Sequence, residues 1–159
     1  MKETANFSRR REIVIVYRHA SDEEMNSIMD LVIRTFTGEQ DIPADMNYLP
    51  PDKQPHWFCA EEGEKLVGTI AFFKEDDSWH AGRLALEPAY RGQHIGTRLV
   101  SYSFSEMFNK GVEEIIMEGR PTTVHILTKL GAQVTGQPFP FYKSTCTPMR
   151  MKREDFRPL

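Results

Sequence analysis

The sequence predicts a single-domain α/β protein with a mixed, mostly antiparallel sheet flanked by helices. Its length of 159 residues fits one domain. Runs rich in β-branched residues alternate with amphipathic helical stretches, in the order β-α-loop-β-β-β-α-β-α-β-β. The middle strands are joined by short turns, which favours an antiparallel meander, and the helix that follows favours a crossover. With 40% hydrophobic and 27% charged residues, the composition argues against a wholly disordered chain.

The first elements expected are a strand at 12–17 and an amphipathic helix of about four turns. Ser21 and Glu24 have the spacing of a capping box at a helix start. Apolar residues then recur at helical spacing until Gly38, namely Met25, Ile28, Met29, Val32 and Phe36. Residues 1–11, which are polar and include three consecutive arginines, are expected to form a flexible lead-in to the strand.

A long loop rich in proline and acidic residues follows at 38–55, with one helical turn expected at 44–48. Long loops in compact domains are often functional. Two strands are then predicted at 56–61 and 65–74, where a short glycine turn favours an antiparallel hairpin. A further strand is predicted at 78–87, after a turn that carries two aspartates.

The second half of the chain predicts two more helices and three more strands. Pro121 suits the first position of a helix, and Gly111 and Gly131 suit the residue just past a helix end. The expected elements are a helix from about 95 to 110, a strand at 112–117, a helix at 121–130, and strands at 132–137 and 144–151.

Charge and composition narrow the classes of function. The formal net charge is −3, whereas proteins that bind nucleic acid by its phosphates normally carry a basic surplus. No apolar run approaches the ~20 residues that cross a bilayer, and the start has no secretory h-region. Cys59 and Cys146 are too few for a disulfide scaffold and lack metal-site spacing. The expectation is a cytoplasmic protein with reduced thiols, no metal, and no nucleic-acid or membrane partner.

The segment that indicates chemistry is 82–98, G-R-L-A-L-E-P-A-Y-R-G-Q-H-I-G-T-R, where a strand ends and a turn opens a helix. The first amides of a helix have no intrahelical partner, and the helix dipole makes them an anion site. Arg91 and Arg98 add charge. The spacing matches neither a Walker loop nor a dinucleotide fingerprint, because Gly92 and Gly96 are four apart with no third glycine. The segment therefore predicts a phosphate or pyrophosphate site, unless the glycines serve turn geometry alone.

The stretch 83–97 resembles the acyl-coenzyme A signature of the GNAT superfamily of N-acyltransferases, in which a strand and a proline precede Arg/Gln-x-x-Gly-x-Gly/Ala at a helix start. K-L-G-A at 129–132 resembles the K-L-G-F of a later helix in that family, and K-L-V-G at 65–68 resembles its usual hairpin. The order of elements agrees with the family across nearly the whole chain.

The resemblance implies transfer of an acetyl group from acetyl-coenzyme A to a primary amine of a small molecule or peptide, by direct attack in a ternary complex. It also implies a sheet splayed into a V and a tendency to form homodimers. Strand backbone groups would pair with the pantetheine arm, and amides of the turn would hold the pyrophosphate. The implied coenzyme A-binding residues are Leu84, Ala85, Leu86, Arg91, Gly92, Gln93, His94, Ile95, Gly96 and Thr97.

Two positions depart from the family pattern. His94 stands at a usual glycine, and Leu127 stands at the tyrosine that is thought to protonate the leaving thiolate. Leucine cannot donate a proton, although a thiolate is a modest base that water could protonate. The missing tyrosine keeps open an alternative, a non-catalytic domain that binds or senses acyl-coenzyme A. A nucleotide-phosphate binder outside the family is a third reading.

An amine with a pKa near 10 must lose a proton before it attacks a thioester. Candidate bases are Glu87 at a strand end, Glu118 at the end of the next strand, and His80, which shares the face of Leu84 and Leu86 unless the strand bulges. A strand amide near Leu86 could bind the tetrahedral oxyanion. Cys146 has no evident base partner in the sequence and is disfavoured as a nucleophile.

The acceptor is expected to bind between the loops 36–55 and 137–147. Asp41 and Asp45 in the first loop faintly favour a cationic acceptor. Arg83 has two interpretations: it could stabilise a negatively charged group on the acceptor, but an ordinary surface arginine is the favoured one.

Overall fold

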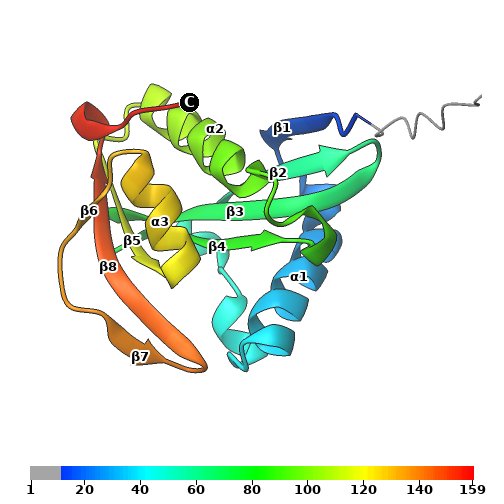
Figure 1. The fold of residues 1–159 in the computed structure, drawn as a ribbon, viewed down its shortest axis with the longest axis horizontal. Coiled ribbons are helices and arrows are strands. Elements are labelled where there is room, and N and C mark those ends of the chain that lie inside the picture. The colour runs from blue at the N-terminus through cyan, green and yellow to red at the C-terminus, as the bar shows by residue number, and fades with distance from the viewer. Residues whose placement is uncertain (1–11) are drawn as a thin grey trace, which may run out of the picture.

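The computed structural model describes residues 12–159, so the lead-in expected at 1–11 lies outside it. An eight-stranded sheet runs in the order β1-β2-β3-β4-β5-β8-β6, and β7 pairs with β8 (Figure 1). Only β4 and β5 pair in parallel among the paired strands of the described chain. This confirms a mixed, mostly antiparallel sheet. The strands are β1 Ile15–His19, β2 His56–Glu62, β3 Lys65–Glu75, β4 Ser78–Leu86, β5 Glu114–Gly119, β6 Gln133–Val134, β7 Phe139–Phe141 and β8 Ser144–Lys152.

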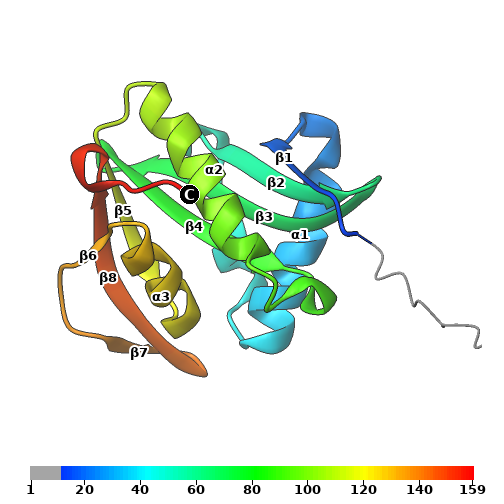
Figure 2. The ribbon, with the colours of Figure 1, turned by 45° about the horizontal axis from the view of Figure 1, so that its top comes forward.

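The α-helices cover both faces of the sheet (Figures 1 and 2). They are α1 Met25–Ile33, α2 Ile95–Asn109 and α3 Pro121–Lys129. Successive residues of β3 point to opposite faces, as in any strand. Phe72 therefore packs with α2 and α3, whereas Phe73 packs with α1.

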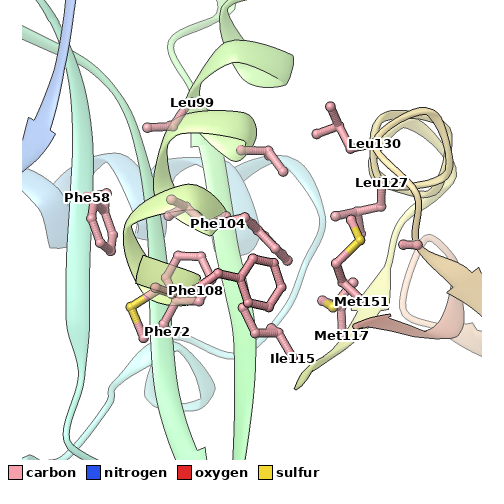
Figure 3. Close-up of a cluster of buried hydrophobic side chains, with 14 of the residues drawn as sticks. Phe58, Phe72, Leu99, Phe104, Phe108, Ile115, Met117, Leu127, Leu130 and Met151 are labelled. Atoms are coloured by element: carbon pink, nitrogen blue, oxygen red, sulfur yellow. The ribbon is translucent and has the colours of Figure 1, made fainter. Parts of the chain in front are cut away.

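The larger core lies between the sheet and the pair α2 and α3 (Figure 3). Phe104 of α2 and Phe72 of β3 are fully buried, with ring centroids 5.1 Å apart in an edge-to-face arrangement. Each buried aromatic or large aliphatic side chain contributes about 1.5–3 kcal/mol. Leu127 and Leu130 fix α3 against the same core. The core thus holds the starts of α2 and α3 on the same side of the sheet.

Several expected boundaries are corrected. The first strand begins at Ile15 rather than at residue 12. The first helix ends at Ile33 and continues as a π-helical turn, Arg34–Glu39, before the loop. The predicted strand at 132–137 is cut to two residues, and an unpredicted strand, Phe139–Phe141, pairs with the start of β8. Glycine and proline on either side of Gln137 interrupt the pairing, because neither favours a continuous strand.

The sheet splays where β4 and β5 separate. They pair over three positions only, from Trp79–Ile115 to Ala81–Met117, yet β4 runs on to Leu86 and β5 to Gly119. A bulge in β4 lies just beyond the last pair. Gly82 faces Ala71 and Ala85 faces Thr69, so two residues of β4 oppose one of β3. The outer edge of β4 is left free of β5, which confirms the V.

Candidate active site

A cleft of about 540 Å³ lies in the V between β4, β5 and the starts of α2 and α3. Most of the residues that the sequence predicts to bind coenzyme A line it. Ala85 and Gln93 do not. Those that do are Leu84, Leu86, Arg91, Gly92, His94, Ile95, Gly96 and Thr97.

The start of α2 presents free amides to this cleft. The first helical hydrogen bond runs from the amide of Arg98 to the carbonyl of His94, at 3.1 Å. The amides of Gly96 and Thr97 therefore precede the intrahelical ladder. No side chain among residues 12–159 caps this helix. The N-terminal start of α2 therefore retains the partial positive charge and the hydrogen-bond donors that suit a phosphate.

Gly96 allows α2 to approach its neighbours closely. A Cβ atom at this position would lie 3.2 Å from Cδ1 of Leu86 and 3.5 Å from Cδ1 of Ile126. The glycine thus brings the helix start against both β4 and α3. A Cβ atom here would require the Leu86 side chain to shift by a few tenths of an ångström, whereas its contact with Ile126 would be an ordinary one.

His94 occupies a left-handed backbone conformation, with φ 63° and ψ 12°. This explains why glycine suits the position, since a side chain costs about 1–2 kcal/mol in this region. The imidazole is exposed and lines the cleft without sealing it.

We expect the free energy of unfolding of His94→Gly to exceed that of His94→Ala by about 1 kcal/mol. The glycine variant should therefore unfold at a higher urea concentration. Both variants remove the imidazole, so the comparison isolates the backbone. Equal stability of the two would contradict a strained turn. The measurement is equilibrium urea denaturation followed by circular dichroism.

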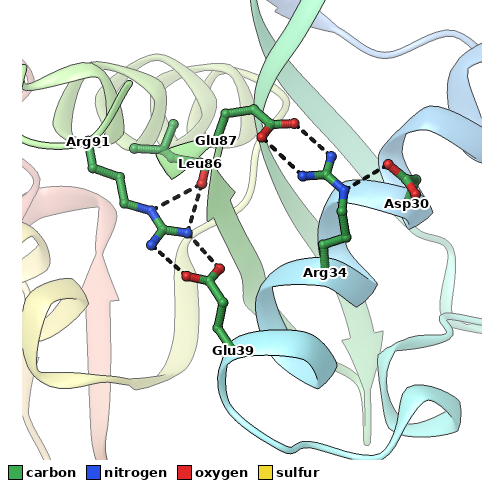
Figure 4. A network of polar contacts seen from close by, with 6 residues as sticks. All are labelled: Asp30, Arg34, Glu39, Leu86, Glu87 and Arg91. Atoms are coloured by element: carbon green, nitrogen blue, oxygen red, sulfur yellow. Dashed lines mark hydrogen bonds and ion pairs between the residues drawn. The ribbon is translucent and has the colours of Figure 1, made fainter. Parts of the chain in front are cut away.

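A polar network ties the end of β4 to α1 and its π-helical turn (Figure 4). Arg91 donates to the carbonyl of Leu86 at 3.0 and 3.2 Å and pairs with Glu39 at 2.8 Å. Arg34 pairs with Glu87 at 2.6 Å and with Asp30 at 2.9 Å. The charge of Arg91, expected from the sequence to serve a phosphate, is neutralised by Glu39. The backbone amides are left as the main anion donors at this turn.

The three candidate bases lie in different surroundings. Glu118 lines the cleft and is exposed near the end of β5. Glu87 does not line the cleft, and the hydrogen bonds from Arg34 lower the pKa of its carboxyl, which makes it a weaker base. His80 stacks on Phe73, with ring centroids 5.7 Å apart, on the α1 face. The bulge places His80 and Leu84 on opposite faces, and His80 is not among the cleft residues, so only Glu118 of the three lines the cleft.

Leu127, at the usual tyrosine position, is 2% exposed and belongs to the larger core while also lining the cleft. Neither cysteine is a prepared nucleophile. Burial raises the pKa of the Cys59 thiol to about 11 and also raises that of Cys146, so both stay protonated at neutral pH.

Sequence reasoning missed a group of polar residues on the α3 side of the cleft: Arg120, Thr122, Thr123 and His125. One signal could have found them. They directly follow β5, and residues that follow neighbouring parallel strands often meet at a binding site. Within residues 12–159 no group of three or more His, Cys, Asp or Glu side chains could hold a metal ion. Over the same residues, no helix has the length and apolar character of a membrane span.

A splayed sheet that leads to an uncapped helix start is the architecture of acyl-coenzyme A-dependent N-acyltransferases. The model of the Acetyltransferase (GNAT) family matches residues 25–132, and the chain belongs to this family. Among curated proteins, none matches the chain significantly.

Solved structures share the fold at low identity. Escherichia coli ElaA is 16% identical, with a TM-score of 0.73, covering 88% of this chain and 99% of its own. An acyl-CoA N-acyltransferase from Pseudomonas aeruginosa is 13% identical, with a TM-score of 0.71 and coverage of 87% and 98%. Spermidine N-acetyltransferase from Vibrio cholerae, solved with CoA and spermine, is 13% identical, with a TM-score of 0.67 and coverage of 89% and 96%.

Proposed function

We propose that this protein transfers an acetyl group from acetyl-coenzyme A to a primary amine in a ternary complex. One observation carries the proposal. The uncapped start of α2 and the free edge of β4 line the same cleft, which is the pairing of features that a diphosphate joined to a pantetheine arm requires. Family membership supports the same chemistry.

The residues of the cleft fit coenzyme A. The turn from Arg91 to Thr97 supplies amides for the pyrophosphate, and Gly92, at φ 77° with open space around it, leaves room for a phosphate oxygen. Leu84 and Ala85 supply strand backbone for the pantetheine arm. The carbonyl of Leu86 already accepts from Arg91, so Arg91 must release it before that carbonyl can pair with a ligand.

Glu118 is the base that the cleft offers. It has no ion-pair partner among the described residues, so its carboxylate is available to take a proton from the amine, directly or through water. The amine nitrogen then bonds to the thioester carbon, with a strand amide near Leu86 stabilising the oxyanion. The carbon–sulfur bond breaks, the nitrogen loses its extra proton to solvent as the amide forms, and the thiolate takes a proton from solvent, because Leu127 supplies none. Placing amine and thioester together provides most of the acceleration.

Replacing Glu118 by Gln is expected to lower kcat about 100-fold while leaving the affinity for acetyl-coenzyme A unchanged. Glu113→Gln is the matched control, because Glu113 is an exposed carboxylate beside β5 that pairs with Arg153 and does not line the cleft. Steady-state kinetics and calorimetry measure the two quantities. A kcat within a few-fold of the wild type would assign proton removal to water or another group.

The alternative is a domain that binds acyl-coenzyme A without turnover, and the buried Leu127 is the observation that favours it. Calorimetry with acetyl-coenzyme A tests the binding of this cofactor, which the enzyme and the non-catalytic domain have in common. We expect binding, together with a higher melting temperature at millimolar ligand. Absence of both would refute the proposal. A screen of amines for release of free thiol then separates the two readings, since turnover well above hydrolysis excludes the sensor.

A further inference from the structure

Two arginine side chains line the cleft without a carboxylate partner. Arg83 lies at the bulge of β4, and Arg120 directly follows β5, so they approach the V from its two walls. Neither forms an ion pair within residues 12–159. We propose that the acceptor carries an anionic group, a carboxylate or phosphate, beside its amine, and that these two guanidinium groups bind it. This rests on the proposed acetyl transfer and names the class of its acceptor.

Arg83 is held in place by neutral groups only. Its backbone has φ 59°, the conformation of the bulge. Its Nε and Nη2 donate to the carbonyls of Asn47 and Met46 at 3.3 and 3.0 Å, and its guanidinium lies 5.3 Å from the centre of the Phe73 ring. Its Nη1 has no hydrogen-bond partner among the described residues. The charge is therefore oriented and partly desolvated, with donors to spare for an anion.

Arg120 has the same character on the opposite wall. Its Nε donates to Oε1 of Gln40 at 2.9 Å, and its Nη1 donates to the carbonyl of Phe141, whose ring lies 5.2 Å from the guanidinium. Its Nη2 is buried without a partner in the part of the chain that the structure describes. A buried cationic donor without a partner is costly, and an anion in the cleft would satisfy it.

The other charges of the cleft do not offset these two. Arg91 is neutralised by Glu39, which leaves Glu118 as the one remaining carboxylate among the described cleft residues. The loop acids that faintly favoured a cationic acceptor are not among the cleft residues. Asp41 pairs with Lys143 at 3.2 Å, outside the cleft. A polyamine would meet two unpaired cations here and would be repelled.

The arginines belong to the acceptor side rather than to the phosphate turn. Arg83 holds the loop at 46–47, and Arg120 holds β7. These lie in the two loops expected to shape the acceptor pocket. The free amides for the pyrophosphate are at the start of α2, which packs on the opposite face of the sheet from Phe73, the ring that lies beside the Arg83 guanidinium. An anion between Arg83 and Arg120 would therefore be a second negative group, distinct from the coenzyme A diphosphate.

The test uses pairs of amines that differ only in the anionic group, bound to the full protein saturated with coenzyme A. The pairs are L-methionine with 3-(methylthio)propylamine, L-phenylalanine with 2-phenylethylamine, and O-phosphoethanolamine with ethanolamine. We expect the anionic member to bind at least tenfold more tightly by calorimetry. The first two pairs report a carboxylate site and the third reports a phosphate site.

Variants separate charge recognition from loop support. Arg83→Gln and Arg120→Gln should reduce the preference for the anionic member at least fivefold, whereas Arg83→Lys should retain part of it. Arg153→Gln, which removes an exposed arginine outside the cleft, should leave the preference unchanged. If a substitution removed only the support of the loops, it would weaken the binding of both amines of a pair equally. The ratio of their affinities would then not change.

The outcomes are distinct. No binding of coenzyme A refutes the proposed function and this inference together. Three results would overturn this inference alone, provided that coenzyme A still binds. The two amines of each pair bind with equal affinity, the simple amines bind more tightly, or no anionic member binds. A preference that survives in both glutamine variants overturns the assignment to these arginines.

Discussion

Replacing Gln93 by Glu is expected to weaken acetyl-coenzyme A binding on the order of tenfold or more. Gln93 is exposed in the turn that opens α2, directly before His94 at the helix start. A carboxylate within several ångströms of a diphosphate costs roughly 1–4 kcal/mol at the dielectric constants of a protein surface. The same charge favours the dipole of α2, which offsets the hydrogen bond to the Ala89 carbonyl that a carboxylate cannot donate, so the fold itself should lose little stability. Calorimetry at low salt measures the affinity.

Two controls assign that loss to charge. Gln93→Ala removes the hydrogen bond that the side chain donates to the carbonyl of Ala89 at 3.1 Å, but adds no charge. It should change the affinity no more than about threefold. The effect of Gln93→Glu should also shrink as salt is raised, because exposed charges are screened. Unchanged affinity of the glutamate variant would place the diphosphate elsewhere and remove the basis of the proposed function.

The Gly131→Ala substitution is expected to lower the free energy of unfolding by about 3 kcal/mol, from backbone strain and overpacking together. Gly131 follows α3 at φ 110°, and a Cβ atom there would lie 2.0 Å from the carbonyl oxygen of Asp155. That oxygen belongs to the backbone of the C-terminal segment, whose Arg157 amide bonds to the carbonyl of Leu130 at 2.8 Å. Either the helix end or this segment must move. The melting temperature should fall by roughly 6–12 °C.

Gly63→Ala is the control, because it introduces backbone strain at a position where the added Cβ atom has no close neighbour. Gly63 has φ 60° in the β2–β3 turn, and a Cβ atom there would have no neighbour within 4 Å. The substitution should cost about 1 kcal/mol from conformation alone. Equal losses at the two glycines would show that the C-terminal segment is free to move away from α3. Thermal unfolding followed by circular dichroism measures both variants.

Local chemistry explains which parts of the fold could be predicted from the sequence. The strands at the hairpin and the long helix at 95–109 follow from hydrophobic periodicity over neighbouring residues. The turn proposed to bind the pyrophosphate follows from glycines and a helix start that lie within seven residues of one another. The short strand at 139–141 was missed because it forms only by pairing with β8, and its sequence of Phe, Pro and Phe carries no such signal.

Like the fold, the candidate site has some features that follow from local sequence and others that depend on tertiary packing. The order of elements and the turn at 91–97 are encoded by residues that act on their immediate neighbours, so the sequence by itself determined the fold class and predicted a phosphate site at this turn. Only the tertiary structure decided that the bulge turns His80 away from the cleft, that Glu39 neutralises Arg91, and that Arg83 and Arg120 face one cleft unpaired. Strand register and pairing between distant charges depend on packing across the whole sheet, which no local pattern specifies.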